Sequence, residues 1–293
     1  MLNEPGSENQ DNQRRHPLLD YAEKQERLAQ ERKHPPQGQV LLRMPVVRPR
    51  AVWVLIGVNV LIYMVAVYVL PIQQLDELYR WGANSHTAVL QQGEYHRLLS
   101  AMFLHSPITP AHIIFNMYAL YAIGITIERF FGHARFLWIY FLGGLAGSIA
   151  SVVLNPPSVT SVGASGAVFA IFGAEMVFLY KHRKLFGKMA QNQLMQLVVV
   201  AVLNFGVGIA TALSSDAQIR IDNWGHVGGF VGGVVLAWFI TPILLPKRHP
   251  TQENALTIED INPLEKHTQV LLAFASVLLG VLLLGTWLAR GGL

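Results

Sequence analysis

The chain has 293 residues, of which 52% are hydrophobic and 14% are charged, and it carries a net charge of +4 and no cysteine. A soluble domain has about 25% charged residues, so this composition is typical of a membrane protein. The lack of cysteine excludes disulfides, thiolate catalysis and cysteine-bound metal centres. The pI of 9.4 would favour nucleic-acid binding in a soluble chain. In a membrane protein basic residues mainly fix the orientation, so we expect no nucleic-acid partner.

The first 50 residues are polar and mix basic with acidic side chains. We expect residues 1–50 to form a solvated cytosolic tail, in which residues 17–34 can form a short charged helix that Pro35 ends. No apolar run precedes Ala51, so the sequence predicts no cleavable signal peptide.

Seven apolar stretches follow, each near the length of about 20 residues that crosses a hydrocarbon core of roughly 30 Å. They cover residues 51–70, 111–131, 135–154, 162–180, 193–213, 223–245 and 268–289. We therefore expect an all-α polytopic membrane protein. Its parts are a six-helix core at 51–245, a cytosolic linker at 246–267, and a seventh transmembrane helix with a short exterior end at 268–293.

The basic residues predict the orientation of these spans. With residue 1 in the cytosol, 18 of the 22 Lys and Arg residues fall on the cytosolic side. The four exterior ones are Arg80, Arg97, Arg220 and Arg290. The positive-inside rule then predicts a cytosolic amino terminus and an exterior carboxyl terminus. The longest exterior connection, residues 71–110, is aromatic and amphipathic, and we expect it to lie on the membrane surface.

Polar residues inside the spans are costly and often functional. His112 and Asn116 lie four residues apart and share one face of the second span. Ser165 lies near the outer end of the fourth span, and His226 lies near the outer end of the sixth. Measured from the cytosolic flanks, Ser165, His112 and His226 lie about 24, 26 and 23 Å along their helices. These side chains are therefore predicted to share one depth in the outer third of the bilayer.

This set of side chains fits nucleophilic acyl transfer. A serine hydroxyl needs a base such as imidazole to accept its proton, so Ser165 and His226 are predicted to act as nucleophile and base. His112, the Asn116 amide and the Ser165 N–H can then stabilise the oxyanion of the tetrahedral intermediate. The base must come within roughly 3 Å of the serine oxygen, which requires small residues where the helices face each other. These small residues are Gly163 and Gly166 on the fourth span and Gly225, Gly229 and Gly233 on the sixth.

The segments that carry these residues resemble the rhomboid family of intramembrane serine proteases, over roughly half the chain from about Gly93 to Gly233. The matching motifs run from His112 to Asn116, from Gly124 to Gly132, from Gly163 to Gly166 and from His226 to Gly233. The resemblance implies a Ser165–His226 dyad without a third, acidic member. It also implies transmembrane protein substrates within the lipid bilayer, and we expect no cofactor. The seventh span resembles the 6+1 subclass of rhomboids.

Two positions depart from the family pattern. The family usually has an aromatic residue before the first-loop arginine, whereas His96 precedes Arg97 here. Gly225 stands where the family often has alanine before the histidine. Neither departure removes a reacting group. In addition to Arg97, we expect Glu128 and Arg129 to give structural support by tying helix ends and the first loop together.

Other titratable residues receive no catalytic role. The exterior histidines His86, His96 and His105 lack metal-ligand spacing, so no metal site is predicted. Glu175, about 15 Å deeper than Ser165, needs a partner or a protonated state within the bilayer. The sequence does not identify that partner.

Several alternatives remain beside the dyad. Asp222, four residues before His226, would complete a triad, but we expect it to cap the sixth helix. A transporter also carries polar residues within its spans. The polar residues of this chain, however, are predicted to share one depth rather than to line a path across the membrane. A metalloprotease would need H-E-x-x-H, which is absent. The last alternative is a catalytically inactive relative that binds and escorts membrane proteins. Because this chain keeps the serine and the histidine, we predict an active protease in a bacterial plasma membrane, with its active site open to the exterior.

Overall fold

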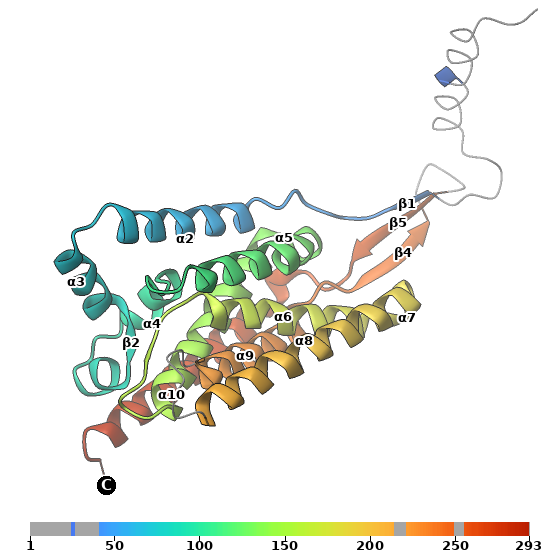
Figure 1. Ribbon diagram of the computed structural model, residues 1–293. Helices are drawn as coiled ribbons and strands as arrows, with labels where there is room; N and C mark the ends of the chain where they lie inside the picture. The colour runs from blue at the N-terminus through green and yellow to red at the C-terminus, as the bar shows by residue number, and fades with distance from the viewer. Residues whose placement is uncertain (1–24, 27–40, 214–220, 249–254, 293) are drawn as a thin grey trace, which may run out of the picture. The chain divides into compact units, whose positions relative to one another are not determined.

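The computed structural model describes residues 25–26, 41–213, 221–248 and 255–292 (Figure 1). Most of the predicted cytosolic tail, and the predicted exterior Arg220, therefore lie outside the described residues. The chain divides into a large unit, residues 45–245 with 259–293, and a small unit, residues 1–44 with 246–258. The domain boundaries predicted from the sequence stay a prediction.

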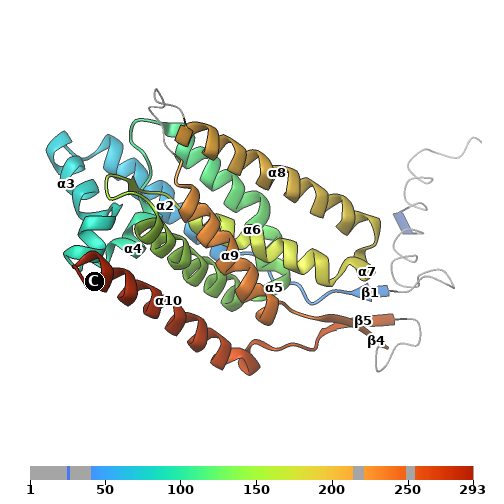
Figure 2. The ribbon, with the colours of Figure 1, turned by 90° about the horizontal axis from the view of Figure 1, so that it is seen from below.

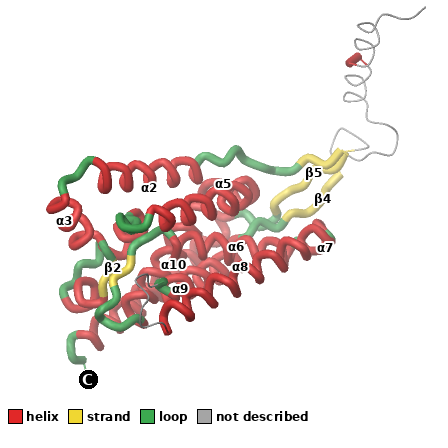
Figure 3. Tube along the Cα trace, viewed as in Figure 1, coloured by secondary structure: helices red, strands yellow, loops and turns green. Residues whose placement is uncertain are grey.

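The large unit is built almost wholly from helices (Figure 3). In chain order they are α2 (Ala51–Tyr68), α3 (Ile72–Gly82), the π-helix η1 (Thr87–Gln91), α4 (Arg97–Ser100), the 3-10 helix η2 (Ala101–Phe103), α5 (Pro110–Leu154), α6 (Ser165–Lys181), α7 (Arg183–Phe186), α8 (Lys188–Leu213), α9 (Asn223–Ile240), the 3-10 helix η3 (Leu264–His267) and α10 (Thr268–Ala289). The helices α2, α5, α8, α9 and α10 are long and apolar enough to cross a bilayer. The predicted fold class, an all-α polytopic membrane protein, is confirmed, whereas the count of six helices plus one stays a prediction.

Helix α5 contains both the second and the third predicted span. Its 45 residues would extend about 68 Å if straight, more than twice a hydrocarbon core of roughly 30 Å. The helix is broken at Gly132, where φ is 78° and ψ is 165°. This φ lies in the left-handed region that favours glycine. Gly132 therefore lets the chain change direction between the two spans.

Helix α6 has most of its residues buried by its neighbours. It begins at Ser165, three residues after the predicted start at 162, because residues 160–161 form a short strand and Gly163 has a φ of 127°. Helix α9 ends at Ile240 rather than at 245. Thr241 leaves the helical region with a ψ of 131°, and Pro242 follows, which cannot donate a helical hydrogen bond.

The connection between α2 and α5, which the sequence predicts to be exterior, is folded. Strand β2 (Asn84–Ser85) pairs antiparallel with β3 (Thr160–Ser161), which lies just before α6. The Asn84 amide also donates to the carbonyl of Ser148 in α5 at 2.9 Å. Arg97 is 9% exposed; it forms an ion pair with Glu94 and donates to the carbonyl of Ala83 at 3.0 Å. The loop that contains Arg97 is therefore fastened to the segment that precedes Ser165.

The amino-terminal end of α2 is capped by a residue far along the chain. The Glu128 carboxylate, in the first half of α5, accepts the backbone N–H groups of Arg50 at 2.9 Å, Ala51 at 2.7 Å and Val52 at 2.8 Å. It also accepts from the His133 ring. A carboxylate at this position satisfies free N–H donors and complements the helix dipole. Glu128 thus joins two helix ends, and none of its hydrogen bonds among the described residues reaches the loop between α2 and α5.

The small unit contains most of a three-stranded sheet. Its strands are β1 (Leu41–Arg43), β4 (Leu244–Arg248) and β5 (Ala255–Asp260), in the order β1-β5-β4. β1 pairs in parallel with β5, with Leu41 opposite Ala255. The sequence does not predict these strands, because such short segments carry no alternating hydrophobic pattern long enough to indicate one.

Candidate active site

Ser165 is the first residue of α6, directly after a strained glycine turn. Gly163 has a φ of 127°, a conformation that side chains rarely adopt. A Cβ atom at this position would also lie 2.8 Å from Nε2 of His112. Both the backbone and the available space therefore require glycine here. As the first residue of the helix, Ser165 has a backbone N–H without a partner inside the helix.

His112 and Asn116, one turn apart near the start of α5, both face this turn. The atom Nδ2 of Asn116 lies 3.9 Å from the position that a Gly163 Cβ would take. Nδ1 of His112 accepts the N–H of Ser106 at 3.2 Å, so a neutral ring carries its hydrogen on Nε2, the atom that faces Gly163. Nδ2 of Asn116 donates one hydrogen to the carbonyl of His112 at 2.8 Å. Its second hydrogen is left for another acceptor.

His226 lies in the first turn of α9. Its ring stacks on Phe169 of α6, with centroids 4.4 Å apart and planes at 21°. Its Nδ1 atom is buried and has no hydrogen-bond partner among the described residues. In the part of the chain that the structure describes, no hydrogen bond joins Ser165 to His226. The histidine is thus held by stacking on the same helix that begins with Ser165.

Glycines bring α6 and α9 into backbone contact. A Cβ atom at Gly229 would lie 2.0 Å from the carbonyl oxygen of Gly166, and one at Gly233 would lie 2.0 Å from that of Ala170. Helix α9 also approaches α5 closely. The carbonyl oxygen of Gly225 lies 2.6 Å from the position that a Cβ of Gly147 in α5 would take. No side chain larger than hydrogen fits at these crossings. Three helices therefore meet closely around the serine.

Asp222 caps α9, as the sequence predicts. Its carboxylate accepts the backbone N–H of Gly225 at 2.9 Å and the side-chain amide of Asn155 at 2.8 Å. Asn155 follows the end of α5, so the carboxylate also links α5 to α9. These contacts account for the Asp222 carboxylate: His226 donates its backbone N–H to the Asp222 carbonyl at 3.1 Å, and among the described residues no hydrogen bond joins the carboxylate to the His226 ring.

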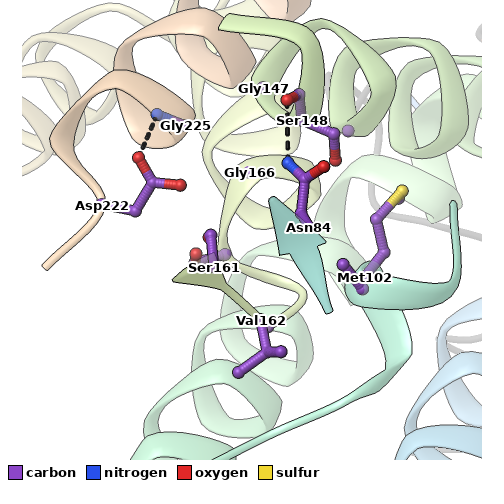
Figure 4. Close-up of a pocket in the computed structure, with 13 residues that line it drawn as sticks. Asn84, Met102, Gly147, Ser148, Ser161, Val162, Gly166, Asp222 and Gly225 are labelled. Carbon is purple, nitrogen blue, oxygen red and sulfur yellow. Dashed lines mark hydrogen bonds between the residues drawn. The ribbon is translucent and has the colours of Figure 1, made fainter. Parts of the chain in front are cut away.

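A small cavity adjoins Ser165 (Figure 4). Its volume of about 20 Å³ is enough for one water molecule. Its polar lining comes from four separate parts of the chain. These polar residues are Asn84, Ser148, Ser161, Ser165 and Asp222. Asn84 Nδ2 points to the Ser148 carbonyl across one side, and Asp222 points to the Gly225 N–H on another (Figure 4).

His105, for which the sequence raises only a metal-ligand role that its spacing does not support, lies beside the turn before Ser165. The side chain is 1% exposed, and its ring lies 5.3 Å from the ring of His112. Its Nε2 atom accepts a long hydrogen bond of 3.5 Å from the N–H of Ala164, the residue before Ser165. Burial, followed by the neighbouring His112, lowers the pKa of His105 to about 3, so the ring stays neutral and able to accept. Sequence spacing gives no signal for such a contact between two loops.

Glu175 also has a partner that the sequence did not reveal. Gln193, near the start of α8, donates to its Oε1 atom at 2.6 Å. The other carboxyl oxygen is buried and has no partner among the described residues. Glu175 therefore joins α6 to α8 and takes no part in the arrangement around Ser165.

Residues 92–243 match the family model of the rhomboid domain. The chain is 38% identical over 162 residues to rhomboid protease GluP of Bacillus subtilis (strain 168), covering 55% of this chain and 29% of that protein. It is 35% identical over 163 residues to RHOMBOID-like protein 2 of Arabidopsis thaliana, covering 56% and 48%. It is 28% identical over 189 residues to putative rhomboid protease YdcA of Bacillus subtilis, covering 60% and 88%.

The match to the family model takes in the end of the loop before α5, the helices α5, α6 and α8, and α9 with His226. The chain spans less than half the length of GluP and of RHOMBOID-like protein 2. Its long apolar helices are those of an integral, multi-pass membrane protein. The chain belongs to the rhomboid family.

Proposed function

We propose that this chain is a serine endopeptidase that hydrolyses peptide bonds in or near the transmembrane segments of other membrane proteins, through a dyad of Ser165 and His226. Membership of the rhomboid family supports protease activity in general, since relatives carry the names rhomboid protease GluP and putative rhomboid protease YdcA. The assignment of residues is supported by the surroundings of Ser165.

One observation carries the proposal. Nε2 of His112, the nitrogen that bears the hydrogen, faces the Gly163 turn at a distance that leaves no room for a side chain. The second amide hydrogen of Asn116 and the free N–H of Ser165 belong to the same turn region. Three donors around one serine are what an oxyanion needs. A serine with a purely packing role has no need of them.

The proposed reaction assigns one step to each of these residues. The Ser165 oxygen attacks the carbonyl carbon of the scissile bond while its proton passes to His226. The negative charge that develops on the carbonyl oxygen is stabilised by His112, Asn116 and the Ser165 N–H. The C–N bond then breaks as His226 returns the proton to the leaving amine. Water, deprotonated by His226, hydrolyses the acyl-enzyme and restores the serine.

The dyad works without an acid in this proposal. Asp222 is engaged by the Gly225 N–H and the Asn155 amide. The His226 ring is instead stacked on Phe169, which restrains the plane of the ring. The alternative function, an inactive escort factor, has no use for the donors around Ser165.

The location and orientation belong to the same proposal. The 18-to-4 distribution of Lys and Arg favours a cytosolic amino terminus and an active site open to the exterior. The relatives include bacterial and plant proteins. The composition of the chain is compatible with a bacterial plasma membrane.

Co-expression tests the function directly. Single-pass membrane proteins carrying a tag at each end are produced with the wild-type chain or with Ser165→Ala, and their fragments are followed by immunoblot. We expect cleavage by the wild type alone, at equal amounts of both chains in the membrane. Equal cleavage with Ser165→Ala would overturn the dyad. Binding without cleavage by both chains would instead support the escort function.

A further inference from the structure

Helix α10 packs along the core by close contacts with small residues. Near its cytosolic half, the Phe274 ring lies 3.4 Å from the position that a Cβ of Gly232 in α9 would take. Nearer the exterior, a Cβ at Gly285 would lie 3.0 Å from Val153 in α5 and 3.7 Å from Leu90 in η1. In both views the carboxyl end of α10 lies at the same end of the large unit as α3 and α4 (Figures 1 and 2).

The exterior part of α10 completes an apolar cluster under the exterior loop. The cluster joins residues from the loop, from α5 and from α10: Val89, Leu90, Leu98, Ile149, Val152 and Leu282. Leu278 and Ala289 of α10 pack against its edge. Val89 is 0% and Leu90 is 1% exposed. Without α10, part of this cluster would face lipid, and η1 would lose the side chains that pack against one of its sides.

Arg290, directly after α10, holds the polar end of the same segment. Its Nε donates to the carbonyl of Leu90 at 3.1 Å. Its Nη2 lies 3.2 Å from the position that a Cβ of Gly93 would take. The carbonyls near the end of a helix lack helical partners, and a guanidinium can satisfy them with the five N–H donors of its rigid, planar fork.

A short series of contacts leads from this point to the serine. Gly93 precedes Glu94, which pairs with Arg97, and Arg97 donates to the Ala83 carbonyl. Asn84 follows and pairs with Ser161 in the short sheet. Ser161 lines the cavity beside Ser165. The steps from Glu94 to Ser161 are hydrogen bonds, an ion pair or covalent neighbours, and Ser161 lies four residues before Ser165 on the wall of the same cavity.

We propose that α10 is a positioning element of the active site: Arg290 and the Leu282–Gly285 face hold the exterior loop, which in turn holds the segment that carries Ser165. The inference rests on the proposed function, because it concerns the efficiency of Ser165. Arg290 acts as a positioning residue and touches no substrate atom. Loss of its side chain frees the Leu90 carbonyl and loosens the loop, so the serine is less often in its reactive position.

The test compares Arg290→Ala with Arg290→Lys in the purified full chain. Leu288→Ala is the matched control, since this side chain is 48% exposed on the same turn. For each variant, kcat and KM are measured on a transmembrane substrate, and the rate of Ser165 labelling by a small fluorophosphonate is measured separately. Rates are divided by the amount of protein whose Ser165 can be labelled, so that a smaller yield of folded protein does not lower the measured rate.

We expect Arg290→Ala to lower kcat and the labelling rate together by about three- to tenfold, the effect of one lost hydrogen bond, with KM changed less. Arg290→Lys restores part of both, and Leu288→Ala changes neither. Unchanged kcat and labelling in Arg290→Ala, or an equal loss in Leu288→Ala, would overturn the proposal.

A cysteine readout is independent of activity. The chain has no cysteine, so Val89→Cys introduces a single thiol at a buried position of the loop. We expect maleimide to modify it at least threefold faster when Arg290 is replaced by alanine, and equal rates would also overturn the proposal. If the wild type neither cleaves nor labels, the proposed function fails, while the thiol still decides whether Arg290 holds the loop.

Discussion

Gly229→Ala is expected to inactivate the protein by separating α6 from α9. The added methyl group would lie 2.0 Å from the carbonyl oxygen of Gly166, whereas ordinary contact begins at 3.4 Å. One helix must therefore retreat by about 1.4 Å, and a misplacement of about 1 Å in an active site costs on the order of 100-fold in rate. His226 lies one turn before Gly229, and Ser165 directly precedes Gly166, so the displacement falls on the dyad. Overpacking also lowers the free energy of unfolding by about 1–3 kcal/mol.

The matched control is Gly280→Ala in α10, where an added Cβ meets nothing within 4 Å. The two variants make the same chemical change in a helix and differ only in the space around it. The ratio kcat/KM is measured on a fluorogenic transmembrane substrate in detergent, and Tm is measured on the same samples. We expect a loss of about 100-fold or more with a lower Tm for Gly229→Ala, and little change for Gly280→Ala. A Gly229→Ala enzyme with more than a third of wild-type activity would refute the argument from helix spacing.

Four further predictions follow from the site and the fold. Ser165→Ala should abolish cleavage, whereas His112→Ala should keep measurable activity, with the rate lowered on the order of 10²–10³-fold. A total loss of activity in His112→Ala would mean that this ring does more than donate to the oxyanion. Asp222→Asn should change kcat little, because asparagine caps a helix nearly as well as aspartate; an inactive variant would replace the dyad with a triad. In intact cells an impermeant thiol reagent should modify Ile108→Cys and leave Lys184→Cys unmodified, and the reverse pattern would invert the predicted orientation. Because a helical peptide bond must be unwound before attack, substrates with glycine or proline near the outer end of their transmembrane segment should be cut faster than leucine-only ones, and equal rates would contradict this.

Much of the fold was accessible from the sequence, since the bilayer imposes a simple rule on length and hydropathy. Each of the seven predicted spans overlaps a helix of the structure. Errors of a few residues occur where local backbone chemistry decides, as at the Gly163 turn before α6 and at Pro242 after α9. The grouping of His112, Asn116, Ser165 and His226 was predicted from their equal depth. Depth alone, however, does not say which ring atom faces which neighbour.

Contacts between irregular segments were not accessible from the sequence. His105 touches the backbone just before Ser165, and Arg290 touches the carbonyl of Leu90, 200 residues away. Neither contact belongs to a helical or strand period, so no pattern along the chain indicates it. The partner of Glu175 was missed for a related reason. Gln193 lies on another helix, and the facing of two helices depends on their packing, which hydropathy does not determine.

The cap that Glu128 provides has a consequence for biosynthesis. Its hydrogen bonds reach back 76 to 78 residues, to the first N–H groups of α2. A ribosome adds roughly 5–20 residues per second, so at that rate the cap is synthesised about 4–15 seconds after the helix that it completes. During this interval the N–H donors at the start of α2 must be satisfied by water or lipid headgroups at the membrane surface. Helix α2 is therefore expected to enter the membrane without its cap, and to gain the cap when the part of α5 that carries Glu128 is inserted.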